Sequence, residues 1–238
     1  MKINRPIPSS QIKLLVFDLD GTLIDSRQDL VNSVNAALRF LERPELPSEV
    51  IASLVGDGAP VLIQRALGDF SSGNPSHNHP IDESLVNRGL EFFLSYYREH
   101  KLDYTKLYDG TEAMLNALEH CNGSRREMAV LSNKPVVPSR AIVDALGIAR
   151  FFRSVYGGNS FVTKKPDPLG LQTILQEAGV RPEECVMIGD SAVDILTGQN
   201  AGTRTLAVSF GFAPHTLSEV HPDIIVESPS EITEALHA

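Results

Sequence analysis

Two aspartates that follow an apolar run, Asp18 and Asp20, have the residue types and spacing most clearly suited to chemistry in this chain. The run, residues 12–17, is rich in Ile, Leu, Val and Phe and predicts a buried strand. Side chains two apart on an extended backbone point the same way, and paired negative charges are costly unless a cation or a catalytic task requires them. One carboxylate beside a divalent metal can attack phosphorus, the other can carry a proton, and Gly21 permits a sharp turn.

Three further polar segments accompany later predicted strands. Ser132 and Asn133 end one strand, Asp190 ends another with Asp194 one helical turn later, and Lys165 lies between these segments beside a proline. Taken singly, the serine could cap a helix, the lysine could occupy an exposed turn, and the acids could be a helix cap and a solvated charge. Because ligands of open α/β sheets bind at the carboxyl ends of the strands, we expect these groups to converge at one edge.

The pattern of the whole chain predicts an α/β fold. Strands and helices alternate from residue 109 onward, which indicates a parallel sheet with helices on both faces. Residues 26–105 show helical patterns and no convincing strand, so we predict a Rossmann-like core at 1–25 and 106–238 with an inserted all-helical cap domain at 26–105. The expected strands lie at 12–17, 128–131, 154–156, 185–188, 205–208 and 224–226, and the main expected helices at 26–41, 48–54, 59–67, 82–101, 111–120 and 138–146. Ser48 is expected to cap the second of these helices and Asp82 the fourth.

Composition narrows the class of protein. The chain of 238 residues carries a net charge of −9, which argues against nucleic acid as a partner. No apolar stretch is long enough to span a membrane, and the polar N-terminus has no apolar signal core. With only two cysteines, of which Cys185 begins an apolar strand, we expect a reducing cytoplasm rather than a disulfide framework. We expect a monomer or a homodimer.

Taken in order, the motifs resemble those of the haloacid dehalogenase superfamily of phosphohydrolases. The first, Asp-x-Asp-Gly-Thr, stands at 18–22; the second is Ser132; the third is Lys165, with Lys164 as a weaker candidate; and the fourth, Gly-Asp-Ser-x-x-Asp, stands at 189–194. Together they span the core and are highly specific. The helical block resembles the cap that this family inserts after its first motif. The residues before the first strand lie outside the motif pattern and have no assigned role.

This resemblance implies a mechanism. Asp18 would be the nucleophile and form an aspartyl phosphate, while Asp20 would act as general acid and then as general base. Mg²⁺ would be held by Asp18, the backbone carbonyl of Asp20 and Asp190, where it would ease the approach of an anionic nucleophile to phosphate.

The resemblance also assigns the groups around the phosphate. Lys165 and Ser132 would hold the phosphoryl oxygens with help from the Asn133 amide, and Thr22 is a further candidate for substrate binding. Asp194 would not bind the metal directly but would orient the groups that bind it, or Lys165, through hydrogen bonds. The cap would close over the substrate and exclude water.

A short cap segment suggests the substrate. Gly56 and Gly58 precede a predicted helix that contains Arg65, and residues 55–67 resemble phosphoglycolate phosphatases. A helix N-terminus offers free amides, and glycines let the backbone approach a small ligand. We therefore predict hydrolysis of a small phosphate monoester, 2-phosphoglycolate first, to glycolate and phosphate. The alternative is an ordinary turn with the arginine in solvent, and the charge of Asp57 would repel a carboxylate unless it points away.

Other functions stay open. A sugar phosphomutase, or a phosphatase of nucleotides or other small metabolites, could share these motifs because fold does not fix substrate. A receiver-type signalling domain also phosphorylates an aspartate beside Mg²⁺, but the helical insert and the Asp-x-Asp pair fit it poorly. A non-catalytic binding module would not need the intact acid and lysine set. His77 and His79 lie in a polar loop and are expected to be solvated rather than metal-bound.

Overall fold

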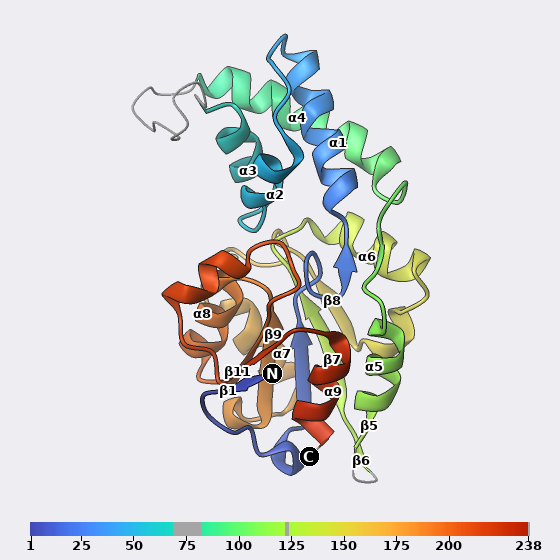
Figure 1. Cartoon of the computed structure of the whole chain (residues 1–238), viewed down its shortest axis with the longest axis vertical. Coiled ribbons are helices and arrows are strands. Elements are labelled where there is room, and N and C mark those ends of the chain that lie inside the picture. Colours follow the sequence, from blue (N-terminus) through green and yellow to red (C-terminus); the bar gives the residue numbers. More distant parts are fainter. Residues whose placement is uncertain (69–81, 122–123, 238) are drawn as a thin grey trace. The chain divides into compact units, whose positions relative to one another are not determined.

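The computed structural model describes residues 1–68, 82–121 and 124–237, so the loop with His77 and His79 lies outside the described residues. The chain divides into two compact units, which are described separately below (Figure 1). One unit comprises Met1–Asp25 and Lys106–Ala238, and the other comprises Ser26–Thr105.

The first unit is built on a sheet with the strand order β1-β11-β10-β9-β2-β7-β8 (Figure 1). Its strands are β1 Lys2–Ile3, β2 Leu14–Phe17, β7 Glu127–Leu131, β8 Ser154–Tyr156, β9 Cys185–Gly189, β10 Arg204–Val208 and β11 Ile224–Val226. All neighbours from β11 to β8 are parallel, and only β1 is antiparallel to its neighbour. The chain proceeds outward from β2 to β7 and β8 and then returns to the other side of β2 with β9. The point where the strand order reverses, where such folds bind ligands, therefore lies between β2 and β9. The predicted α/β fold class is confirmed.

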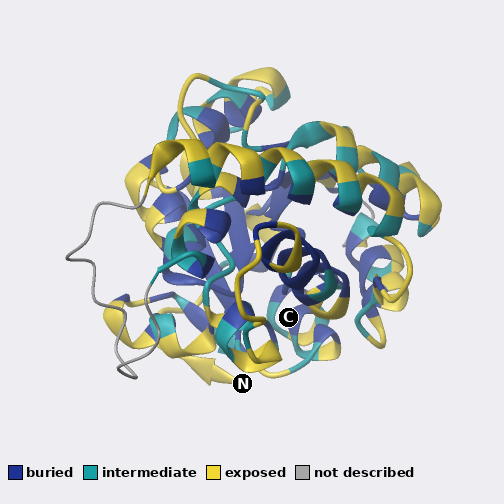
Figure 2. Ribbon diagram, turned by 90° about the horizontal axis from the view of Figure 1, so that it is seen from above, coloured by how far each residue is buried: buried dark blue, intermediate teal, exposed yellow. Residues whose placement is uncertain are grey.

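Helices cover both faces of this sheet. Helices α5 Thr111–Glu119, α6 Val136–Ala145 and α9 Pro229–His237 pack on one face, and α7 Leu169–Ala178 and α8 Ala192–Ala201 on the other. Strand β2 shows why its sequence is apolar throughout: Leu15 and Phe17 join the core under α5 and α6, whereas Leu14 and Val16 join the core under α7. A strand buried on both faces needs apolar residues at every position. Accordingly the central strands β2, β7, β9 and β10 are buried almost throughout, while the helices show buried and exposed sides (Figure 2).

Several short elements escape the sequence patterns. They are the antiparallel pairs β3 Ile24–Asp25 with β4 Lys106–Leu107 and β5 His120–Cys121 with β6 Ser124–Arg125, and the 3₁₀ helices η1 Ser9–Gln11, η2 Ala149–Phe151, η3 Pro182–Glu184 and η4 Pro214–Glu219. The N-terminal segment also has a structural place, because β1 pairs with the edge strand β11 and Ile7 and Ile12 enter the core. Buried Arg126 donates to the backbone oxygens of Ser9 and Ile12 and ties this segment down.

The second unit is helical, with α1 Arg27–Phe40, α2 Ser48–Ser53, α3 Ala59–Ala66 and α4 Glu83–His100. Buried Asp29 accepts hydrogen bonds from Tyr104 N, Thr105 N and Thr105 Oγ1, which joins the two ends of the unit. The N-cap of α4 is Asp82, as predicted, and its carboxylate accepts from Ser84 N. Ser48, predicted to cap α2, is instead its first residue; Pro47 occupies the N-cap position.

Among the described helices, none combines the length and the apolar character that a membrane crossing requires.

Candidate active site

Two acids from neighbouring strands lie side by side at the carboxyl edge of the sheet. Asp18 directly follows β2, and Asp190 directly follows β9. The parallel register pairs Phe17 with Ile188, and Asp18 N donates to Ile188 O at 2.8 Å. Register rather than sequence distance thus brings together two carboxylates that are far apart in the chain.

A third acid, Asp194 in the first turn of α8, completes the cluster. Its Oδ2 accepts from Ser191 Oγ at 2.6 Å and from Ser191 N at 3.2 Å, so the helix start fixes its orientation. A Cβ on Gly189 would lie only 2.2 Å from Asp194 Cγ, and glycine alone leaves room for the carboxylate. Asp18, Asp190 and Asp194 are all buried, and each places a carboxylate oxygen within 4.8 Å of the others.

One buried lysine balances part of this negative charge. Lys165, from the loop before α7, places Nζ 2.7 Å from Asp18 Oδ1 and 2.5 Å from Asp194 Oδ1. Asn133 Nδ2 donates to the backbone oxygen of Lys165 at 3.1 Å and ties its loop to the end of β7. Burial by itself lowers the pKa of Lys165, but the two carboxylates outweigh burial and raise that pKa above its usual value. The lysine therefore stays charged.

The remaining negative charge suits a cation. Burial raises the pKa of Asp190 to about 8, with added repulsion from Asp194 and Asp18, although Phe212 N and Ala213 N donate to Asp190 Oδ2 at 2.6 and 3.2 Å. Burial likewise raises the pKa of Asp18 to about 6 despite the lysine beside it. Three buried carboxylates facing one ammonium form an oxygen-rich, electron-rich site, which fits a hard divalent cation such as Mg²⁺.

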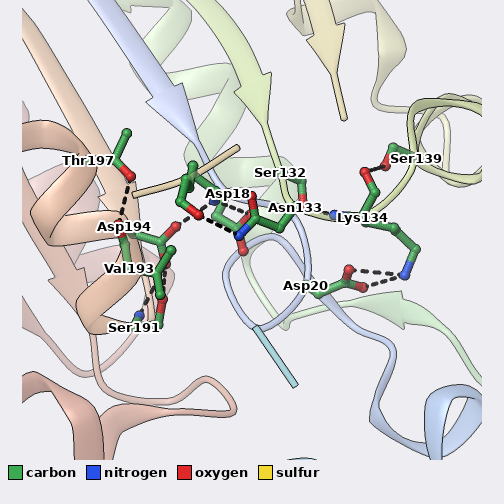
Figure 3. A network of polar contacts seen from close by, with 11 residues as sticks. Asp18, Asp20, Ser132, Asn133, Lys134, Ser139, Ser191, Val193, Asp194 and Thr197 are labelled. Carbon is green, nitrogen blue, oxygen red and sulfur yellow. Dashed lines mark hydrogen bonds and ion pairs between the residues drawn. The ribbon is translucent and has the colours of Figure 1, made fainter. Parts of the chain in front are cut away.

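Asp20, the second acid of the Asp-x-Asp pair, faces a different lysine. Lys134 Nζ lies 2.9 and 3.0 Å from the two carboxylate oxygens of Asp20 (Figure 3). The side chains are almost buried, with 5% of Lys134 and 12% of Asp20 exposed. The sequence pattern predicted roles for Ser132 and Asn133 but none for this lysine. Its place directly after them, at a strand end, was the available signal.

The candidate phosphate-binding residues also gather at this edge. Ser132 Oγ accepts from Lys134 N at 3.3 Å. Ser132, Asn133, Lys164 and Lys165 line a pocket together with apolar Leu131 and Phe161, and Lys165 also contacts the acid cluster. Buried Thr22 has no hydrogen-bond partner for Oγ1 among the residues that the structure describes. Hydroxyl, amide and ammonium groups together can hold the oxygens of a phosphoryl group.

The predicted cap residues lie in the helical unit. Gly58, with φ of 88°, precedes α3, and Gly56 has φ of 135°. Arg65 does not stand alone in solvent: its guanidinium contacts Asp57 Oδ2 at 2.6 Å and Leu54 O at 3.3 Å. The negative charge of Asp57, which would repel a carboxylate substrate, is thus paired with Arg65 of the following helix. Contact of Gly56, Gly58 and Arg65 with a substrate stays a prediction.

The chain is similar to known hydrolases in both sequence and structure. The family model of the haloacid dehalogenase-like hydrolases matches residues 12–202. A phosphoglycolate phosphatase of Pseudomonas syringae pv. tomato is 37% identical over 90% of this chain and 76% of its own length, and one of Vibrio parahaemolyticus is 34% identical over 94% and 96%. The crystal structure of a predicted phosphoglycolate phosphatase from Haemophilus somnus has a TM-score of 0.84 and 30% identity, and covers 94% of this chain and 97% of that one.

Proposed function

We propose a reaction for this chain, which belongs to the haloacid dehalogenase-like hydrolases and is a phosphoric monoester hydrolase. In this proposal the protein hydrolyses 2-phosphoglycolate with Mg²⁺ through an aspartyl phosphate on Asp18. The observation that carries the chemistry is the buried arrangement of Asp18, Lys165 and Asp190 at the switch point of the sheet. The substrate rests on the named activity of relatives that match most of this chain, and on the cap loop. A cytoplasmic location and the oligomeric state stay predictions.

The first half of the proposed reaction transfers the phosphoryl group to the protein. A carboxylate oxygen of Asp18 forms a bond to phosphorus while the ester oxygen leaves, and Asp20 gives that oxygen a proton. Lys165 stays charged beside Asp18 and, with Ser132, meets the phosphoryl oxygens. Asp18, Asp190 and the backbone carbonyl of Asp20 would hold Mg²⁺, which when bound offsets the repulsion between carboxylate and phosphate.

The second half returns the protein to its starting state. Asp20, now deprotonated, accepts a proton from water, whose oxygen attacks phosphorus and releases Asp18 as a carboxylate. Inorganic phosphate then leaves. Splitting the hydrolysis in this way replaces one difficult displacement by two easier ones.

The substrate preference is assigned to the loop before α3. Gly58 precedes a helix N-terminus with free amides, and positive φ at Gly56 and Gly58 shapes the loop so that its backbone can approach a small anion. Arg65 adds a positive charge to this region, although Asp57 already holds the guanidinium. Recognition of a carboxylate therefore requires the substrate to compete with, or to lie beside, this internal ion pair.

The decisive measurement compares kcat/KM for 2-phosphoglycolate with kcat/KM for ethyl phosphate, which has a similar length and no carboxylate. We expect a clear preference for 2-phosphoglycolate, and equal values would reject carboxylate recognition. Gly58→Val should reduce that preference more than it reduces hydrolysis of p-nitrophenyl phosphate. Gly147→Val is the matched control, because Gly147 has a similar φ of 73° and no atom within 4 Å of its Cβ position.

A further inference from the structure

Lys134 has no role in the mechanism above, yet it contacts one of the two acids of the Asp-x-Asp pair. Its Nζ lies within hydrogen-bond distance of both carboxylate oxygens of Asp20, and both side chains are almost buried (Figure 3). We propose that Lys134 is a positioning residue that holds the Asp20 carboxylate in the orientation from which it serves as acid and base. The inference rests on the proposed role of Asp20.

The backbone of Lys134 is held firmly enough to serve as a support. Lys134 N donates to Ser132 Oγ at 3.3 Å, and Lys134 O accepts from Gly158 N at 2.9 Å. A Cβ on Gly158 would lie 2.4 Å from Asn133 O, so glycine is needed for this close approach. Pro135 follows as the N-cap of α6. The lysine therefore extends from a turn that is held on both sides.

Two contacts from one ammonium also restrict the carboxylate itself. Charge-assisted hydrogen bonds are stronger than neutral ones, and two of them fix the rotation of the Asp20 carboxylate as well as its position. A proton donor misplaced by about 1 Å can lose about 100-fold in rate. The other buried lysine of the site, Lys165, is engaged by Asp18 and Asp194. The two acids of the pair are thus each supported by a separate lysine.

A positioning role predicts a loss that depends on the leaving group. Lys134→Met should lower kcat for ethyl phosphate by about 10- to 100-fold, as part of the 10²- to 10⁴-fold that acid–base groups supply, with little change in KM. The variant should lower kcat for p-nitrophenyl phosphate by less than about threefold, because a nitrophenolate leaves without a proton. Lys13→Met is the matched control, because it removes a lysine paired with Glu184 at 2.7 Å, at the amino end of β2. This variant should change kcat for neither ethyl phosphate nor p-nitrophenyl phosphate.

A double-mutant cycle separates positioning from direct contact with phosphate. In an Asp20→Asn background, Lys134→Met should cost almost nothing further on ethyl phosphate, because a residue that acts through Asp20 has no other route. Full additivity, or equal losses on both esters, would overturn the inference. If Lys134→Met does not fold, Lys134→Gln, which removes the charge but keeps a polar amide, takes its place under the same criteria.

The same data distinguish failure of this inference from failure of the proposed function. If Asp20→Asn alone loses equally on both esters, the acid role of Asp20 is wrong, and the role of Lys134 falls with it. If Asp20→Asn is selective and Lys134→Met is not, only the positioning role is wrong. Continued hydrolysis of p-nitrophenyl phosphate in every variant would show that the phosphatase chemistry itself stands.

Discussion

A methyl group added to Gly21 tests whether the placement of Asp190 limits catalysis. Gly21 has φ of 83°, and a Cβ there would lie 2.3 Å from Asp190 Oδ2 and 2.8 Å from Asp190 Cγ. Ordinary contacts between heavy atoms lie at about 3.5 Å, so Gly21→Ala must move the Asp190 carboxylate by about 1 Å. Its hydrogen bonds from Phe212 N and Ala213 N, at 2.6 and 3.2 Å, would then lengthen or break.

Gly179→Ala provides the matched control, since it imposes backbone strain without the clash. Gly179 ends α7 with φ of 64°, and no atom lies within 4 Å of its Cβ position. Alanine in this left-handed region lowers the free energy of unfolding by about 1–2 kcal/mol at either position. In a chain of this size, each kcal/mol lowers Tm by about 2–4 °C. In Gly21→Ala, weakened hydrogen bonds to a buried carboxylate add about 1–3 kcal/mol.

The kinetic outcomes of the two variants should differ more than their stabilities. Displacement of a catalytic group by about 1 Å can cost about 100-fold, so we expect kcat of Gly21→Ala to fall by that order and its requirement for Mg²⁺ to rise. Gly179→Ala should keep the kcat and Mg²⁺ requirement of the unchanged protein. Steady-state assays over a Mg²⁺ titration, with Tm measured on the same samples, decide the matter. Wild-type kinetics in a folded Gly21→Ala protein would refute the reasoning.

Four further outcomes are expected. Asp18→Asn should abolish turnover while the protein stays folded, and more than trace activity of the purified variant would exclude the covalent route. Burial raises the pKa of Asp190 to about 8 from its ordinary 3.8, so between these two pH values the folded metal-free protein retains a proton that the unfolded chain loses. The free energy of unfolding of the metal-free protein should therefore fall as the pH rises from 3.8 to about 8. Mg²⁺ competes with that proton, so the rise in Tm on adding Mg²⁺ should be larger at pH 8 than at pH 6, and equal rises would count against metal binding at the carboxylates. Asp29→Ala should destabilise the helical unit by about 2–4 kcal/mol, because it leaves the donors at Tyr104 and Thr105 unpaired, and a denaturant titration measures this loss.

The sequence alone determined the features that depend on local pattern. The apolar run of β2 predicted a buried strand because a strand covered on both faces needs apolar side chains throughout. Alternating strands and helices then predicted the sheet, and the polar residues at strand ends predicted which edge of the sheet carries the candidate site. Helix ends were harder to locate: Ser48 has the right residue type for an N-cap, yet α2 begins one residue earlier than that assignment allows.

Only the tertiary structure decided which groups meet. The register of β2 against β9 places Asp18 beside Asp190, and the turn held by Gly158 directs Lys134 to Asp20. These contacts join residues far apart in the chain, and no spacing along the sequence specifies a distance across strands. The ion pair between Arg65 and Asp57 shows the same limit at short range, because residue types can suggest two opposite charges but only the fold of the loop determines that they neutralise each other.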